Sequence, residues 1–150
     1  MKKLSLVIFA VLFLISPVLK AESGHGHSHE HIGGPKGGRL LERTEPQAEF
    51  FLEKDRTVTI SFYDHEMKPV PVENQSVVVN AEKDGVKTKF ELEKKGDVLV
   101  SNGQLPEGSP NLVVQFKQSP DAKPSNFRFV LEEGVCGECK RAEYACVCEH

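Results

Sequence analysis

Apolar and polar residues alternate with a period of two along most of the chain from residue 39 to residue 133. In the clearest run, Val58, Ile60 and Phe62 are separated by Thr59 and Ser61. Successive side chains of a β-strand point to opposite faces of its sheet, so this alternation predicts strands with one buried face. The same reasoning gives the expected strands as residues 38–42, 48–53, 57–63, 77–82, 86–93, 97–101, 112–116 and 127–131.

Turn-forming pairs separate these runs, among them Asp84-Gly85, Gly96-Asp97 and Asn102-Gly103. Gly and Asn adopt positive φ at little cost, which suits tight connections between strands. Seven or eight short strands without helical periodicity predict an all-β domain over residues 39–133, an antiparallel sandwich of the immunoglobulin or cupredoxin kind. Because the chain has no Trp, the core is expected to contain Phe50 or Phe51, Phe62, Phe90, Phe116, Phe127 and Phe129.

Residues 1–21 have the outline of a secretory signal peptide. A basic start, Met1-Lys2-Lys3, precedes an apolar run over residues 4–15 that ends at Ser16-Pro17, and Ala21 suits a cleavage site. A membrane-spanning helix needs roughly 20 apolar residues, and this run is shorter. We therefore expect a periplasmic or otherwise secreted protein that meets the membrane only through its export signal.

Removal of this leader makes the chain more acidic. The whole chain has 19 Lys and Arg against 22 Asp and Glu, and residues 1–21 contain three of the lysines and no acid, so the net charge changes from −3 to −6. A phosphate backbone is repelled by such a balance, and no basic stripe interleaved with aromatics offsets it. Nucleic acid is therefore excluded as a partner, and cations are favoured.

Residues 22–38 form a histidine- and glycine-rich arm with few residues that a core would bury. The composition predicts a flexible segment, with the glycine run at residues 33–38 as a hinge. Neutral imidazole is a common metal ligand, and alternate spacing lets several rings converge on one Cu(II), Ni(II) or Zn(II) ion. The other interpretation is a low-complexity tract that binds metal only incidentally. The expected ligands are His25, His27, His29 and His31.

All four cysteines lie in a tail over residues 134–150, spaced C-x2-C-x6-C-x-C. Four thiolates in a short loop suit a tetrahedral ion such as Zn(II) or Fe, and thiolates also favour Cu(I). The expected cofactor is thus a Zn or Cu ion. The expected ligands are Cys136, Cys139, Cys146 and Cys148, with His150 as a further donor.

Two other readings of these cysteines stay open. In an oxidising compartment they can form two disulfides, and pairing across the two groups is favoured because a bridge from Cys146 to Cys148 is strained. Cys136-Gly137-Glu138-Cys139 also has the spacing of a thiol redox motif, although no strand and helix flank it in the expected way. No other catalytic motif is found, so we expect no enzymatic activity.

Residues 29–42, HEHIGGPKGGRLLE, resemble the His-rich "G-P-x-G-G-R-L-L" start of an N-terminal domain in some periplasmic adaptor subunits of heavy-metal efflux pumps. Residues 48–52 and Met67-Lys68-Pro69-Val70 are similar to that domain's first strands and its "G-K-P" turn. The chain departs from the family at Lys36, where His is frequent, and it has neither the long hairpin nor the barrel that bridge a pump. The Cys tail lies outside the matched region.

The resemblance implies a stand-alone relative concerned with copper, zinc or similar cations, whose partners include metal ions and components of a heavy-metal efflux system. The residues and the resemblance together predict a periplasmic metal-binding protein that acts as a scavenger, buffer or donor to an export system. The alternative is a non-catalytic secreted β-sandwich interaction module with a disulfide-bonded tail.

Overall fold

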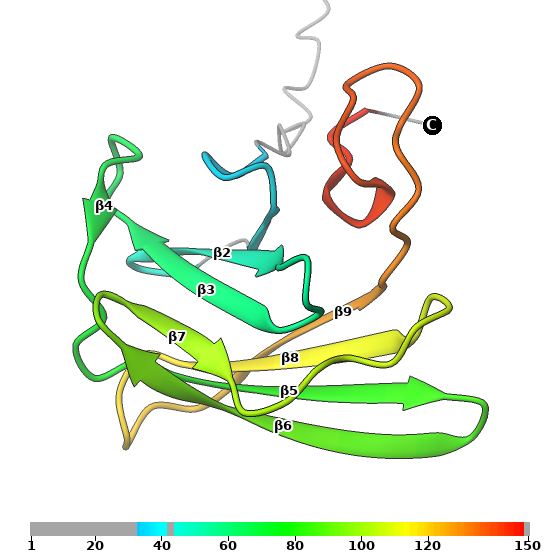
Figure 1. Cartoon of the computed structure of the whole chain (residues 1–150). Coiled ribbons are helices and arrows are strands. Elements are labelled where there is room, and N and C mark those ends of the chain that lie inside the picture. The colour runs from blue at the N-terminus through cyan, green and yellow to red at the C-terminus, as the bar shows by residue number, and fades with distance from the viewer. Residues whose placement is uncertain (1–32, 42–43, 149–150) are drawn as a thin grey trace, which may run out of the picture.

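The computed structural model describes residues 33–41 and 44–148 of the 150-residue chain (Figure 1). The expected signal peptide lies outside these ranges. Within them no helix is long and apolar enough to cross a membrane. The described elements are β1 (Arg39–Leu41), β2 (Gln47–Leu52), β3 (Val58–Tyr63), β4 (Pro69–Val70), β5 (Ser76–Lys83), β6 (Val86–Lys95), β7 (Val98–Ser101), β8 (Asn111–Lys117), β9 (Ser125–Val130) and a 3₁₀ helix, η1 (Glu143–Ala145).

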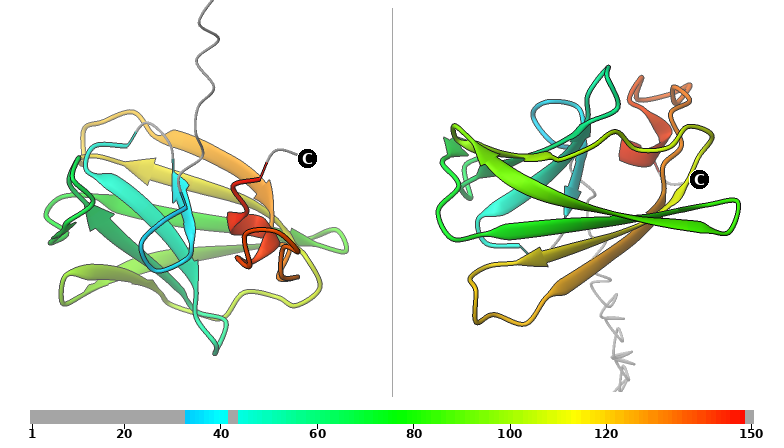
Figure 2. Two further views of the ribbon diagram at one scale, coloured as in Figure 1. Left: turned by 90° about the horizontal axis from the view of Figure 1, so that it is seen from above. Right: turned by 60° about the horizontal axis from the view of Figure 1, so that its bottom comes forward.

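The strands form one antiparallel sheet in the order β1-β2-β3-β7-β6-β5-β8-β9, with β4 added beside β3. The sheet folds over through β6 and β7, so that β2 and β3 lie in a layer opposite β5, β8 and β9 (Figures 1 and 2). The all-β antiparallel class predicted from the sequence is confirmed. Its two layers belong to a single continuous sheet, which makes the fold a near-barrel.

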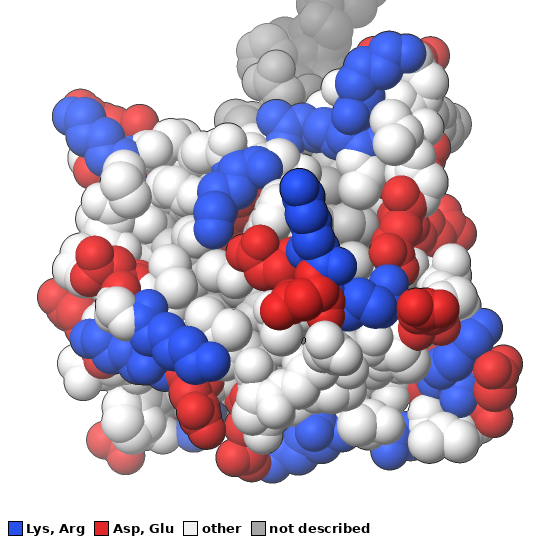
Figure 3. Space-filling view, viewed as in Figure 1, with Lys and Arg blue, Asp and Glu red and all other residues white. Residues whose placement is uncertain are grey.

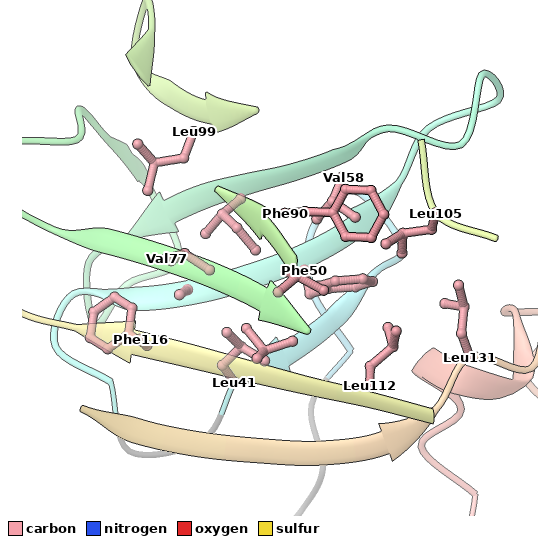
Figure 4. Close-up of a cluster of buried hydrophobic side chains, with 14 of the residues drawn as sticks. Leu41, Phe50, Val58, Val77, Phe90, Leu99, Leu105, Leu112, Phe116 and Leu131 are labelled. Atoms are coloured by element: carbon pink, nitrogen blue, oxygen red, sulfur yellow. The ribbon is translucent and has the colours of Figure 1, made fainter. Parts of the chain in front are cut away.

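The hydrophobic core fills the space between the two layers (Figure 4). Because side chains alternate along each strand, every second residue contributes an apolar side chain to this core. From β3, Val58, Ile60 and Phe62 point inward, and all three are at most 1% exposed. The phenylalanines expected in the core are confirmed, with Phe50 rather than Phe51 buried. Phe50, Phe62, Phe90 and Phe116 are buried, and Phe127 and Phe129 pack partly buried against them.

Most strand predictions agree with the structure to within a few residues, and the β5–β6 connection shows why. Lys83 pairs with Val86, and the two residues between them, Asp84 and Gly85, have φ values of 51° and 80°. A two-residue turn with both φ values positive matches the twist of a hairpin, which is the role expected of Asp-Gly. The sequence analysis missed β4 and η1, which are too short to show a period.

The outer face of β2 and β3 is covered by the segment that precedes β1. Glu49 points outward from β2, yet it is fully buried, because residues 34–38 fold over it. Its carboxylate accepts hydrogen bonds from the backbone N–H of Lys36 (3.0 Å) and of Gly38 (2.7 Å), and from the hydroxyl of Tyr63 (2.8 Å). Residues 33–38 are therefore a turn held on the sheet, where the glycine content had predicted a hinge.

Candidate metal centre

The segment after β9 forms a small hairpin that carries the first two cysteines. Val135 and Ala142 form an isolated antiparallel bridge, and the N–H of Cys136 donates to the carbonyl oxygen of Arg141 at 2.8 Å. At the tip, Lys140 has a φ of 61° and its N–H donates to the carbonyl oxygen of Cys136. This tight reversal keeps Cys136 and Cys139 on one short loop.

Helix η1 then turns the chain back toward that loop. The N–H of Glu143 donates to the carbonyl oxygen of Gly134 at 2.7 Å, and the N–H of Cys146 donates to the carbonyl oxygen of Glu143 at 3.1 Å. The hairpin and η1 lie beside each other in Figure 1, coloured orange to red. The second pair of cysteines thereby reaches the first.

The four sulfur atoms form a compact cluster, here called the four-cysteine cluster: Cys136, Cys139, Cys146 and Cys148. All four Sγ atoms lie within 4.8 Å of one another. The Cys136–Cys148 and Cys139–Cys146 Sγ separations are both 3.8 Å, and the Cys136–Cys146 separation is 3.3 Å. A tetrahedral ion with metal–sulfur bonds of about 2.3 Å needs sulfur atoms about 3.8 Å apart, so the cluster has the dimensions of a tetrahedral thiolate site.

Backbone donors favour the ionised form of Cys139. The N–H groups of Arg141 and Val147 are directed at its sulfur and lower the pKa of Cys139 from 9.0 to about 6. A thiolate is the form that binds a metal, so this cysteine is prepared for ligation near neutral pH.

The pKa values of the second pair of cysteines are shifted upward. Desolvation raises the pKa of Cys148, and hydrogen bonds with the neighbouring thiols raise it further. For Cys146, the N–H of Cys148 lowers the pKa, but the contact with Cys136, together with desolvation, outweighs it and the net shift is upward. Four sulfur atoms at this distance cannot all ionise without a nearby cation, because their negative charges repel one another.

The cluster is sheltered on one side only. Cys136 is 1% exposed, whereas Cys139, Cys146 and Cys148 are half-buried. Because three of the cysteines are half-buried, an ion bound by these thiolates would be reachable from solvent. The face of the molecule seen in Figure 3 carries Lys and Arg interspersed with Asp and Glu, with no broad patch of one sign.

The Cys-rich segment is also joined to the β domain, which the sequence analysis did not foresee. The sequence predicted a tail outside the β domain, but Tyr144 and Ala145 belong to the main hydrophobic core. The carbonyl oxygen of Tyr144 accepts a hydrogen bond from Arg39 Nη1 in β1. The only sequence signal of this attachment is an aromatic residue between the two pairs of cysteines.

The structure thus brings together one of the two expected sets of ligands. The expected ligands His25, His27, His29, His31 and His150 lie outside the described residues. The remaining histidine, His65, is exposed in the turn between β3 and β4. In the part of the chain that the structure describes, the four-cysteine cluster is the one group of side chains arranged to hold a metal ion.

The chain was compared with models of protein families, with curated proteins and with solved structures, and none of the three comparisons gives a match. The chain's own residues therefore carry the functional argument: a near-barrel followed by four cysteine sulfur atoms at the spacing of a tetrahedral metal site.

Proposed function

We propose that this protein is a non-catalytic metal-binding protein of the periplasm, or of another compartment reached by secretion. The four-cysteine cluster is the observation that carries the proposal. Its sulfur atoms come from two separate loops and still converge within 4.8 Å, one of them with a pKa of about 6. Like-charged ligands held this close together are expected where a cation completes the site.

Zn(II) is the ion that fits the sulfur geometry best. Structural zinc sites are four-coordinate and tetrahedral, and the two 3.8 Å separations agree with that arrangement. Cu(I) is the second candidate, because thiolates are soft ligands and the cluster contains no oxygen donor. The ligand type disfavours Mg(II) and Ca(II), which prefer oxygen.

A role in storing or passing on the ion follows from the exposure of the ligands. Three of the four cysteines are half-buried, so a competing thiol or a partner protein could replace them one at a time. We infer a scavenger, buffer or donor, and the resemblance of residues 29–42 to adaptor subunits makes a heavy-metal export system the intended recipient. His25, His27, His29 and His31 would capture the ion weakly and quickly, and His150 would assist the cysteines.

Native mass spectrometry of the reduced protein, with Zn(II) and Cu(I) offered separately, tests the proposal. We expect one tightly held ion per chain, and its loss in Cys136→Ser, because Cys136 is the buried ligand. A variant with His25, His27, His29 and His31 changed to Ala keeps the cysteines and separates the two sets of ligands. Retention of the ion by Cys136→Ser, or no ion on the reduced wild-type chain, would contradict the proposal.

A disulfide-bonded interaction module is the second candidate function, and one feature of the cluster favours it. The two 3.8 Å contacts, Cys136–Cys148 and Cys139–Cys146, pair every cysteine once and join the two groups. This is the cross-pairing expected in an oxidising compartment. Thiol counting on protein isolated from its native compartment distinguishes the candidates: two bridges and no metal support the module, and four reactive thiols or a bound ion exclude it.

A further inference from the structure

Tyr144 lies where the two ends of the sheet approach each other. Strands β1 and β9 end the strand order, and within the described residues no ladder of hydrogen bonds joins them. The ring of Tyr144 meets the ring of Phe50 from β2 edge to face at 5.8 Å, and it stacks on Phe129 from β9 at 6.5 Å. We call this junction the barrel seam: Arg39, Phe50, Leu52, Phe129 and Glu132.

Hydrogen bonds hold Tyr144 to both sides of the barrel seam. The N–H of Leu52 donates to the hydroxyl of Tyr144 at 3.2 Å, and Arg39 Nη1 donates to its carbonyl oxygen at 3.1 Å. The N–H of Tyr144 donates to the carbonyl oxygen of Glu132 at 2.9 Å. Three strands and the segment after β9 are therefore joined through one side chain and its backbone, and Tyr144 is only 5% exposed.

Helix η1 has little stability of its own. It contains three residues, and no side chain caps its start. So short a helix is held by tertiary contacts rather than by its own hydrogen bonds. The position of η1 therefore depends on the seating of Tyr144 in the seam.

The ligands on either side of η1 depend on the same seating. Backbone hydrogen bonds link Glu143 to Gly134, just before Cys136, and Cys146 to Glu143. If Tyr144 left the seam, η1 would move, and the Cys146 and Cys148 pair would move away from the Cys136 and Cys139 pair. The contacts of Tyr144 in the seam therefore support the position of η1 and, together with the hairpin bonds, the spacing between the two pairs of sulfur atoms.

We propose that Tyr144 is a positioning residue that couples metal binding at the four-cysteine cluster to closure of the barrel seam. This inference rests on the proposed function. Binding of the ion fixes the two pairs of cysteines and keeps Tyr144 seated, and the seated ring holds the ligands at the spacing the ion requires. Coupling between two sites is reciprocal, so each event strengthens the other by the same factor.

Two variants separate coupling from simple loss of packing. Tyr144→Phe keeps the ring and removes the hydroxyl that Leu52 contacts, and Tyr144→Ala removes both. Tyr63→Phe is the matched control, because it deletes the other tyrosine hydroxyl of the chain, on Glu49 and away from the cluster. Zn(II) affinity is measured by competition with a chelator, and the absorption spectrum of bound Co(II) reports whether four sulfurs ligate.

In these titrations we expect Tyr144→Ala to bind Zn(II) about 10 to 100 times more weakly, as when other supporting groups of metal sites are lost. Tyr144→Phe should recover most of that loss, and Tyr63→Phe should bind like the wild type. Co(II) should show the four-sulfur spectrum in every variant that binds it. Wild-type affinity in Tyr144→Ala would overturn the coupling and leave the proposed function intact.

Hydrogen exchange of the Leu52 amide tests the reciprocal effect in the unaltered protein, so the inference does not depend on whether Tyr144→Ala folds. If release of Tyr144 requires loss of the ion, free Zn(II) at a hundred times its dissociation constant should slow this exchange about a hundredfold. Exchange that is unchanged by bound Zn(II) would overturn the coupling alone. Failure of the wild-type chain to bind Zn(II), Co(II) or Cu(I) would remove the proposed function and the coupling together.

Discussion

Two segments without strand periodicity flank the sheet, and they are completed in different ways. Residues 33–38 form a turn around the carboxylate of Glu49, and residues 134–148 form the hairpin and helix around the four-cysteine cluster. The carboxylate of Glu49 has all its partners within the protein, whereas the four sulfur atoms face mainly one another. The first segment is complete without a cation, and the second is the one in which we propose that a metal ion binds.

The contrast lies in the balance of donors and acceptors. Glu49 brings one negative charge and receives two backbone N–H groups and one hydroxyl. In the described residues every buried polar side-chain atom has a hydrogen-bond partner. At the four-cysteine cluster the N–H groups of Arg141, Val147 and Cys148 face up to four charges that repel one another, so a nearby cation would be needed for all four thiols to ionise together. Comparing the two segments therefore tests whether the second depends on a metal ion for its stability, as the proposed function requires, while the first does not.

The largest effect on the first segment is expected from Glu49→Ala. It leaves the N–H groups of Lys36 and Gly38 and the hydroxyl of Tyr63 without their acceptor, so the free energy of unfolding should fall by about 3 kcal/mol. Chemical denaturation of the metal-free protein measures the change. Glu91→Gln is the control, because Glu91 is exposed on β6 and its substitution should cost less than about 0.5 kcal/mol. Equal stability of the two variants would contradict this account of the turn.

The next largest change in stability is expected from Gly34→Ala, and Gly137→Ala makes the same substitution in the other segment. A Cβ at Gly34 would lie 2.1 Å from the carboxyl carbon of Glu49, whereas a Cβ at Gly137, in the cysteine hairpin, would meet nothing within 4 Å. Gly34→Ala should therefore destabilise the protein by about 1 to 3 kcal/mol, as overpacking does. Gly137→Ala should leave both stability and Zn(II) affinity unchanged. Thermal unfolding of the two variants, with and without Zn(II), checks both expectations.

The strands and the cysteines could be predicted because their signals are local. Alternation along one strand is enough to assign its faces. The C-x2-C spacing of Cys136 and Cys139 is enough to place their two sulfur atoms on one short loop. The burial of Glu49 could not be foreseen, because alternation places it on the outer face and its cover comes from Lys36 and Gly38, which lie 13 and 11 residues away. That contact depends on how the chain folds back, which no local pattern encodes.

The seating of Tyr144 was missed for the same reason. A single aromatic residue in a short cysteine-rich segment shows no period, and its partners come from β1, β2 and β9, whose order around the sheet was not predictable. The signal peptide, the histidine ligands and His150 lie outside the described residues and stay predictions. Local patterns thus pointed to the four cysteines that the structure brings together, and tertiary contacts that these patterns do not specify determine how the cysteines are held.

Arg141 links the two segments, and its removal should have a modest effect. Its Nη1 donates to the carbonyl oxygen of Gly34 at 3.1 Å, and its guanidinium lies against Gly33. Arg141→Met keeps an extended apolar side chain and loses this bond, so the free energy of unfolding should fall by about 0.5 to 1.5 kcal/mol. Lys140→Met, at the exposed neighbouring position, is the control. A loss above 3 kcal/mol would mean that the two segments depend on each other far more than their separate partners suggest.

The smallest effect becomes visible only at alkaline pH. It concerns the two tyrosines, Tyr63, which contacts Glu49 under the first segment, and Tyr144, which lies in the second. Burial and the hydrogen bond to Glu49 raise the pKa of Tyr63 from 10.0 to about 12, and burial also raises the pKa of Tyr144. A pKa raised by folding stabilises the protein fully below pH 10.0, the unfolded value, and that contribution is lost as the pH rises toward about 12. In a Tyr144→Phe background, the absorbance of tyrosinate should show this late titration, and Glu49→Gln should return the pKa of Tyr63 toward its ordinary value. A titration of Tyr63 unaffected by Glu49→Gln would show that the carboxylate does not govern this side chain, and the account of the first segment as centred on Glu49 would fail.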